Sequence, residues 1–402
     1  MKPMRTSRVF MTLAISTVFL AGCGAPGGNA SFSVPGAAQA PNAQTRHAAP
    51  GMLGRKGALE FAYVSNGGSN SISAYAIDTT SGALTPVPGS PFAAGTTPQI
   101  IAIDAKGRFA YVANPGSNNI SGYTINAANG ELAPVAGSPF NAGTTPQTVA
   151  VDPTGKFVYA ANIGSDNVSA YRIDASSGAL KPVKGSPFGA GSESVWVVVD
   201  PKGSFVYVTN HGSKTVSGYA INKSSGALTP VTGSPFATGT GPVGEAIDPS
   251  GKFAYVVNFG GNNVSGYTID ADGVLTPITG SPFVAGSVPT DMAIEPNGKF
   301  AYVSDQSTDA ISGYSIDPSS GALTAVTGSP FAAGNHPYGV AVDPAGKFAY
   351  AANLNSDNVS AYTINANSGE LTPVAGSPFG GGTPVYVATC RSKKGKCIPP
   401  PL

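Results

Sequence analysis

The sequence predicts an all-β fold built from seven similar units, and three observations support this prediction. Phe-x-Tyr recurs at intervals of 48 residues, once 47, and Gly-Ser-Pro-Phe closes each unit. Short runs of alternating apolar and polar residues lie between these motifs, separated by Gly, Pro, Asn and Asp. No window has the apolar period of a helix. Four antiparallel strands repeated at about 40–50 residues are typical of a β-propeller blade, so we predict seven four-stranded blades.

The third unit illustrates the strands expected in every blade. Its four strands are expected at residues 149–152, 157–162, 168–173 and 180–188. The first and second strands, like the third and fourth, are joined by turns, whereas a loop joins the second to the third. Each sheet must bury both faces against its neighbours, which accounts for the Phe and Tyr in every unit.

The two ends of the repeat region are predicted to close the ring. The first Phe-x-Tyr, at Phe61, has no first strand immediately before it. Pro384–Cys390, after the seventh unit, matches the first strands of the other units. We therefore expect the C-terminal segment to supply the innermost strand of the blade formed by residues 59–92. This arrangement leaves no open sheet edge between the first and last blades.

The N-terminus carries the features of an exported protein. Three basic residues precede an apolar stretch, Val9–Leu20, which is shorter than the roughly 20 residues needed to span a bilayer. Small residues follow, so residues 1–22 are predicted to be a signal peptide. The ending Leu-Ala-Gly-Cys23 resembles the lipobox of bacterial lipoproteins, which implies cleavage before Cys23 and lipidation of that residue. An ordinary signal peptide with an incidental cysteine is the alternative.

The remaining chain divides into a tether, the propeller and a tail. Residues 23–57 would form the lipidated cysteine and a flexible tether, because their composition cannot offset the entropy lost on ordering. The propeller is expected at 58–390 and the tail at 391–402. Lipid chains would then hold the protein at the cell envelope without a spanning segment. In a Gram-negative host, similarity to such lipoproteins implies the outer membrane.

Charge and cysteine content narrow the possible partners and cofactors. Charged residues are 11% of the chain and the net charge is +1, with no basic cluster except at 391–396, so we expect no nucleic-acid binding. Cys390 and Cys397 form an even pair in an oxidising compartment and are predicted to form a disulfide. That disulfide would contribute roughly 2–3 kcal/mol. We expect no zinc site, because two thiols with no nearby His are too few ligands for this metal. We also expect no other cofactor, and we expect the protein to be a monomer.

The repeated Phe-Ala-Tyr-Val-x-Asn, as at 109–114 and 253–258, resembles the Tyr-Val-Thr-Asn propeller repeats. With the Asp-Pro-x-Gly-Lys-Phe turn it also resembles the propeller-type lactonase family, which includes bacterial 6-phosphogluconolactonases. The resemblance covers residues 58–390 and implies a lactone-opening activity. The family's Gly-Pro-Arg-His type motif, whose Arg and His line the central pocket, has no match here. The corresponding segments, none with Arg-His, begin at Pro98, Pro146, Ser194, Pro242, Pro289, Pro337 and Pro384.

Positions that differ between the units are the candidates for function. The loops between second and third strands, and those that precede each first strand, share one rim of the ring, which we call the loop rim. The two turns of each unit form the opposite rim, the turn rim. The turns are nearly identical, whereas the loops vary. Non-repeating aromatic and ionisable residues map to the loop rim or to the adjoining part of the first strand: Glu193, Trp196, His211, Glu245, Phe259, Asp291, His336, Tyr338 and Tyr386.

These residues fall into two groups of candidates. His336, Glu245 and His211 are candidate catalytic residues. Glu193, Trp196, Phe259, Asp291, Tyr338 and Tyr386 are candidate ligand-binding residues of the rim. Glu245 occupies a position where the other units have Ile, Val or Met. Burial of a lone carboxylate is unfavourable unless the group is paired or solvated. We therefore expect Glu245 to lie at the mouth of the central channel. The two histidines, from non-adjacent blades, are no metal signature. Loop divergence without any ligand is the alternative.

Two functions remain open from the sequence. The predicted anchor, the rigid ring and the missing Arg-His pair favour a module that binds a small molecule, glycan or protein at the loop rim. The alternative is a lactonase-like hydrolase in which rim His and Glu activate water, which requires hydrogen-bond reach between base and water. The sequence favours the binding module and leaves open whether the protein is an enzyme.

Overall fold

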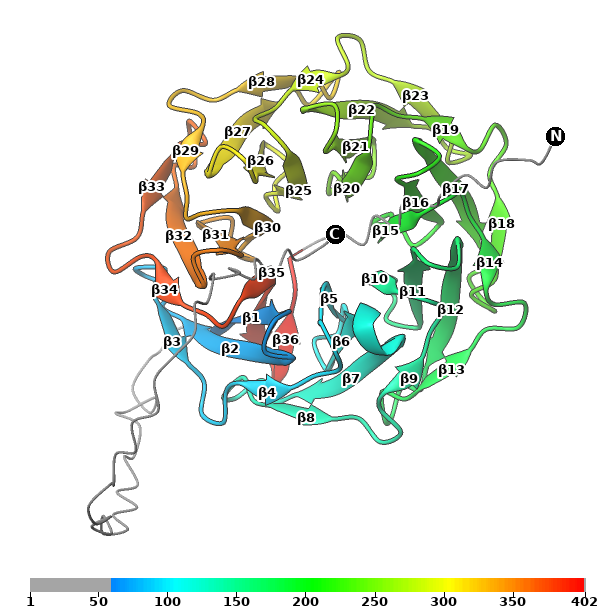
Figure 1. Ribbon diagram of the computed structural model, residues 1–402, viewed down its shortest axis with the longest axis horizontal. Coiled ribbons are helices and arrows are strands. Elements are labelled where there is room, and N and C mark those ends of the chain that lie inside the picture. The colour runs from blue at the N-terminus through cyan, green and yellow to red at the C-terminus, as the bar shows by residue number, and fades with distance from the viewer. Residues whose placement is uncertain (1–58, 401–402) are drawn as a thin grey trace, which may run out of the picture. The chain divides into compact units, whose positions relative to one another are not determined.

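The computed structural model describes residues 59–400, which form a ring of seven β-sheets around a central axis (Figure 1). Each sheet is antiparallel and has four strand positions, which confirms the predicted fold. The predicted signal peptide, the predicted lipidation site Cys23 and the predicted tether lie outside the described residues. Within residues 59–400 the helical structure is one 3-10 helix, η1 (Pro115–Ser117), and no helix could cross a membrane.

Three strand positions are regular in every blade. The innermost strands are β35 (Pro384–Lys393), β5 (Ile101–Ile103), β10 (Pro146–Val151), β15 (Ser194–Val199), β20 (Pro242–Ile247), β25 (Pro289–Ile294) and β30 (Pro337–Val342). The second strands are β1 (Glu60–Asn66), β6 (Phe109–Asn114), β11 (Phe157–Asn162), β16 (Phe205–Asn210), β21 (Phe253–Asn258), β26 (Phe300–Asp305) and β31 (Phe348–Asn353). The third strands are β2 (Ser71–Ile77), β7 (Asn119–Ile125), β12 (Asn167–Ile173), β17 (Thr215–Ile221), β22 (Asn263–Ile269), β27 (Ala310–Ile316) and β32 (Asn358–Ile364).

The fourth strand is split into two short pieces, whereas we expected one continuous strand, as over 180–188. The Ser of Gly-Ser-Pro-Phe lies between the pieces, and the Ser186 hydroxyl accepts a hydrogen bond of 2.8 Å from the Ala170 N–H. The next residue, Pro, cannot donate to the ladder, so the strand is interrupted there. The pieces are β3 (Leu84–Pro86), β4 (Phe92–Ala93), β8 (Leu132–Pro134), β9 (Phe140–Asn141), β13 (Leu180–Pro182), β14 (Phe188–Gly189), β18 (Leu228–Pro230), β19 (Phe236–Ala237), β23 (Leu275–Pro277), β24 (Phe283–Val284), β28 (Leu323–Ala325), β29 (Phe331–Ala332), β33 (Leu371–Pro373) and β34 (Phe379–Gly380).

The repeated tyrosines join neighbouring blades. On the second strand, Tyr111 is fully buried and donates to the Gly178 carbonyl of the next blade at 2.8 Å. On the third strand, Tyr171 donates to the Asn141 carbonyl of the preceding blade at 2.6 Å. Each tyrosine buries its apolar aromatic ring while its hydroxyl donates a hydrogen bond. The buried hydroxyl is therefore not left without a hydrogen-bond partner. These repeated residues therefore hold the ring together.

The C-terminal strand closes the ring, as predicted. β35 pairs with β1 from Glu60, opposite Arg391, to Asn66, opposite Pro384. The closure also has a side-chain link, because Tyr350 of the last blade donates to a carbonyl of the first at 3.0 Å. The first blade thus contains strands from both ends of the described chain.

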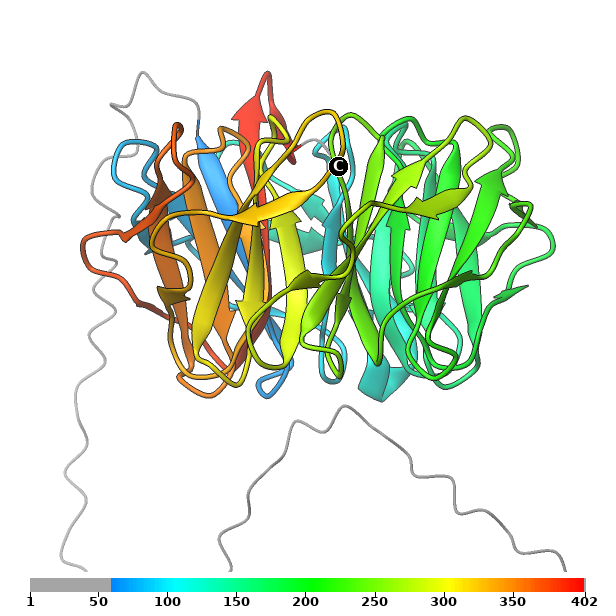
Figure 2. The same ribbon diagram turned by 90° about the horizontal axis from the view of Figure 1, so that it is seen from above.

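A hairpin follows the closing strand, within the segment we expect to be a tail. β35 runs on to Lys393, and the chain returns as β36 (Lys396–Ile398). The predicted disulfide is present and joins Cys390 to Cys397, with 5.2 Å between their Cα atoms. The Cys397 N–H donates to the Gly107 carbonyl, in the first turn of the next blade, at 2.8 Å. Figure 2 shows this hairpin projecting on the turn rim.

Candidate functional site

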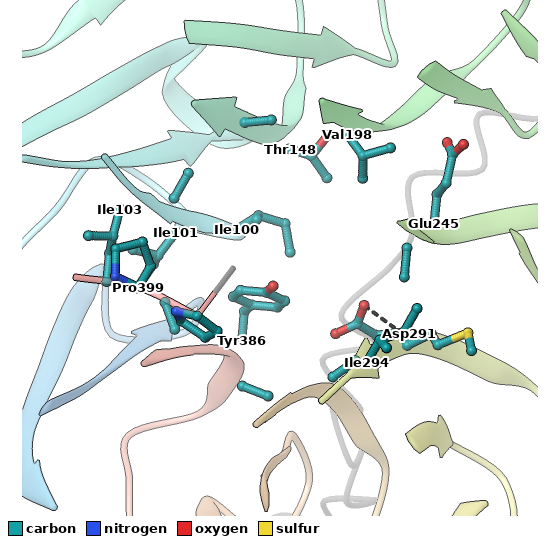
Figure 3. Close-up of a pocket in the computed structure, with 18 of the residues that line it drawn as sticks. Ile100, Ile101, Ile103, Thr148, Val198, Glu245, Asp291, Ile294, Tyr386 and Pro399 are labelled. Atoms are coloured by element: carbon teal, nitrogen blue, oxygen red, sulfur yellow. Dashed lines mark hydrogen bonds between the residues drawn. The ribbon is translucent and has the colours of Figure 1, made fainter. Parts of the chain in front are cut away.

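A cavity of about 240 Å³ lies at the centre of the ring (Figure 3), lined by all seven innermost strands. Most of its wall is Ile, Val and Ala, and Pro399 and Pro400 line it beside the turn rim. Two carboxylic acids interrupt the apolar wall, Glu245 on β20 and Asp291 on the neighbouring β25. Figure 3 places both on the side of the cavity opposite Ile103 and Pro399.

An aromatic pair separates the cavity from the loop rim. Trp196 and Tyr386 come from non-adjacent blades, yet their ring centroids are 6.4 Å apart in an edge-to-face arrangement. Ile100 and Val195 pack in the same cluster, and Trp196 is only 7% exposed. The described lining includes no residue of the variable loops. The cavity therefore extends from the aromatic pair toward the turn rim.

Asp291 is held by backbone donors. The side chain is 1% exposed, its Oδ1 accepts from the Met292 N–H at 2.8 Å, and its Oδ2 accepts from the Val340 N–H at 3.0 Å. Val340 belongs to the next blade, so the carboxyl also bridges two innermost strands. Burial raises the pKa of Asp291 to about 7, against the lowering effect of these two hydrogen bonds. Figure 3 shows the carboxyl directed toward Tyr386 across the cavity.

Glu245 is buried, so our expectation that it lies at a wet channel mouth was wrong. The side chain is 2% exposed and its Oε2 accepts from the Thr209 hydroxyl at 2.8 Å. Its Oε1 is buried and has no hydrogen-bond partner among the described residues. Burial raises the pKa of Glu245 to about 8, although the Thr209 hydrogen bond lowers it. The residue is tolerated in an apolar position because it keeps its proton near neutral pH.

The structure thus brings Trp196, Glu245, Asp291 and Tyr386 to one cavity. The other candidates do not line it: Glu193, His211, Phe259, His336 and Tyr338.

These remaining candidates have other surroundings. His211 Nδ1 lies 3.1 Å from the Pro242 carbonyl oxygen, and His336 Nδ1 lies 2.9 Å from the Asn335 Oδ1. Phe259 packs against the interblade core. Burial raises the pKa of the Tyr338 hydroxyl, and the nearby Asp291 carboxylate raises it further. Within residues 59–400, no group of three or more His, Cys, Asp or Glu is placed to hold a metal.

Sequence reasoning missed three residues of the site. Thr209 lies on the second strand of the blade that precedes Glu245, and its hydroxyl is a weak signal because Ser65 and Ser304 carry one at the same position of other units. Pro399 and Pro400 carry no such signal, because their place depends on the hairpin that turns the chain back to the axis.

Comparisons with known proteins agree with this architecture. In sequence, no curated protein matches the chain significantly. A structure from Bacteroides uniformis, provisionally described as a 6-phosphogluconolactonase, superposes with a TM-score of 0.74 at 22% identity, over 83% of this chain and 99% of that one. A periplasmic gluconolactonase from Pseudomonas aeruginosa superposes with a TM-score of 0.72 at 18% identity, over 84% of this chain and 100% of that one. At such identities these likenesses show the fold alone.

The family assignment comes from the sequence of the repeats. The model of the family described as "Lactonase, 7-bladed beta-propeller" matches residues 37–141, 101–198 and 190–389. These matches cover most of the chain and include six innermost strands in full and β35 as far as residue 389. The chain therefore belongs to the lactonase family of seven-bladed β-propellers.

Proposed function

We propose that this protein hydrolyses a lactone in the central cavity, with Asp291 as the general base that later returns the proton and Glu245 as a hydrogen-bond donor to the carbonyl oxygen. The observation that carries the proposal is the pair of buried carboxyls in one apolar cavity, with pKa values raised to about 7 and about 8. Two acids with environments that shift their pKa values toward neutrality are a recurrent arrangement for acid–base catalysis. Family membership supports hydrolysis more than the binding module that the sequence favoured.

Asp291 is suited to act as the base. With a pKa of about 7, a substantial fraction of the side chain is ionised at neutral pH, and a base is most effective when its pKa lies near the working pH. The two backbone N–H groups fix the position of the carboxylate. They occupy two of its roughly four lone-pair sites, so the carboxylate can still accept a hydrogen bond from water.

Glu245 is suited to act as the hydrogen-bond donor. With a pKa of about 8 it retains its proton at neutral pH. Because Oε2 accepts the hydrogen bond from Thr209, the proton belongs on Oε1, the oxygen without a partner. Because Oε1 is buried, the proposal requires the Glu245 side chain to turn toward the lumen when substrate binds, where its O–H donates to the lactone carbonyl and stabilises the negative charge that develops on it. Such a donor is most effective where water is excluded.

The reaction balances with these two groups. Water attacks the lactone carbonyl carbon while one of its protons passes to the Asp291 carboxylate, and the carbonyl electron pair moves to the oxygen that faces Glu245. When the tetrahedral intermediate collapses, the ring C–O bond breaks and the leaving oxygen takes the proton from Asp291. The product is the open hydroxy acid, and Asp291 is ionised again. This scheme uses neither the Arg-His pair of the family motif nor the loop-rim histidines.

Hydrolysis of a lactone panel by the purified protein tests the proposal. We expect turnover by the wild type and a loss of about 10²–10⁴-fold in kcat/KM for Asp291→Asn. Glu245→Gln should lower kcat while the protein remains folded, which circular dichroism checks. If no lactone is turned over and a glycan or protein binds saturably instead, the binding module is the correct function.

We also propose that the protein works outside the cytoplasm, anchored through Cys23. The support is the sequence of residues 1–23 alone. Expression with a labelled fatty acid in a Gram-negative host should label the wild type but not Cys23→Ser. Equal labelling of both proteins would contradict lipidation at this residue.

A further inference from the structure

We infer that the cavity selects a lactone with an aliphatic substituent and no ionised group, and that it rejects a phosphorylated sugar lactone. This inference rests on the proposed function and specifies its substrate class. Three features of the cavity carry it: the absence of cations from the described wall, the small apolar residues near the middle of each innermost strand, and the position of both acids near one end.

No Lys, Arg or His belongs to the described lining of the cavity. Proteins bind phosphate with Arg or Lys, or with the backbone N–H groups at a helix N-terminus. The described chain has no α-helix to offer such a terminus. The exposed lysines of the first turns, such as Lys106 and Lys347, lie on the turn rim and do not line the cavity. A phosphate dianion inside would therefore be unpaired, in low dielectric and close to the Asp291 carboxylate, which is strongly unfavourable.

The wall offers apolar contact instead. One cavity-lining residue near the middle of each innermost strand is small, which leaves space where larger side chains would narrow the lumen: Ala102, Ala150, Val198, Ala246, Ala293, Ala341 and Ala388. Ile and Val from the same strands complete the lining. A hydrocarbon chain gains free energy from this burial in proportion to its apolar area. The hydroxyls of a sugar ring would lose their hydrogen bonds to water and find few partners.

The polar groups lie at one end of this apolar space. Asp291 is the first residue of its innermost strand that lines the cavity, and Trp196 and Tyr386 occupy the equivalent position of their own strands. Glu245 lies one residue further along its strand. From that level to Ile103 and Pro399 the wall continues for roughly 10 Å, at about 3.3 Å per strand residue. A lactone ring can thus meet both acids beneath the aromatic pair while its aliphatic chain extends toward Pro399.

The fluorescence of Trp196 tests this inference separately from catalysis. Trp196 is the single tryptophan of the chain and lines the cavity, so its emission reports occupancy whether or not turnover occurs. We would titrate the full-length protein with δ-decalactone, glucono-δ-lactone and freshly prepared 6-phosphoglucono-δ-lactone. We expect δ-decalactone to bind at least about tenfold more tightly than glucono-δ-lactone, with no saturable response to the phosphorylated lactone. Equal or tighter binding of the phosphorylated lactone would overturn the inference.

The same titration distinguishes the two proposals. Saturable binding of δ-decalactone without hydrolysis would contradict the proposed function and leave the selectivity intact. Hydrolysis of the phosphorylated lactone in preference to δ-decalactone would keep the function and overturn the selectivity.

A pair of matched variants locates the binding. Ala150→Leu narrows the lumen and should weaken δ-decalactone binding about tenfold or more, whereas Ala332→Leu, at an exposed position on β29, should leave it unchanged. Thermal unfolding would check that both variants fold. Unchanged affinity in a folded Ala150→Leu variant would show that the ligand binds elsewhere, against the inference.

Discussion

The outer three strands of each blade and the innermost strand meet different demands. The outer strands repeat the same side chains, and Tyr111 and Tyr171 represent a set of buried hydroxyls that bond to the adjacent blades. The innermost strands keep a common backbone path but differ at the positions that meet the axis, where Trp196, Asp291 and Tyr386 occur at equivalent places. The repeated residues are needed for the ring, and the varied ones determine what the cavity can hold.

This comparison also separates the two rims. The variable loops of the loop rim hold both folded-domain histidines, yet those loops do not line the cavity, whereas Trp196 and Tyr386 do. Sequence variability alone therefore identified too large a candidate surface. Of the candidates selected by variability, those that line the cavity are on the innermost strands: Trp196, Glu245, Asp291 and Tyr386.

The largest effect is expected from removal of the closing strand. Deletion of residues 384–402 leaves the β1 edge unpaired and removes the disulfide. The free energy lost exceeds the small net stability of a folded domain. We expect no cooperative thermal transition in this variant. Deletion of residues 399–402 is the control and should shift Tm by less than about 2 °C. An unchanged Tm after the larger deletion would contradict closure by β35.

A smaller effect is expected from the buried acid of β20. The folded protein holds the proton of Glu245 up to about pH 8, whereas the unfolded chain releases it near 4.5. The stability that this group contributes is therefore complete below pH 4.5 and is lost as the pH rises to about 8. We expect Glu245→Gln to lack this loss, so its Tm relative to wild type should rise by more than about 5 °C between pH 5 and pH 8.

The matched control is Glu370→Gln, at an exposed turn position. Its Tm should follow that of the wild type at every pH. If Glu245→Gln also follows the wild type, then Glu245 is ionised or solvated in the folded protein, and it cannot be the proposed hydrogen-bond donor to the lactone carbonyl.

The smallest of the three expected losses of stability is that caused by substitution of a glycine on an innermost strand. A Cβ at Gly339 would lie 2.7 Å from the Val385 carbonyl oxygen and 2.8 Å from the Tyr386 Cα, so the adjacent strands must separate to accept it. Gly189, on the outer β14, has nothing within 4 Å of such a Cβ. We expect Gly339→Ala to cost about 1–3 kcal/mol in urea unfolding and Gly189→Ala to cost almost nothing. Equal costs would remove the distinction between inner and outer strands.

Most of the fold could be predicted because the repeat is strict. Seven copies of Phe-x-Tyr fix the number of blades, and Pro384–Cys390 shows by its likeness to other first strands how the ring closes. The split fourth strand could not be predicted in the same way, since alternation extends through 180–188 and only the Ser186 hydroxyl reveals the interruption. The return of β36 toward the axis likewise depends on packing against Gly107.

Four residues of the cavity wall were among the candidates from the sequence, but the geometry of the cavity was not predictable. Departure from the repeat identified Trp196, Glu245, Asp291 and Tyr386. That Trp196 and Tyr386 meet across the axis depends on their rotamers and on the width of the lumen, which strand spacing does not reveal. The burial of Glu245 was missed because an acidic residue at an apolar position can be either solvated and ionised or buried and protonated. The surrounding side chains determine which of these two states is adopted.

A crystal structure of Asp291→Asn with δ-decalactone would test the central claim most directly, since this variant should bind the lactone without opening it. Our account predicts electron density inside the ring, with the lactone beside Glu245 and its alkyl chain directed toward Pro399. Density on the loop rim near His211 or His336, with the interior empty, would contradict it.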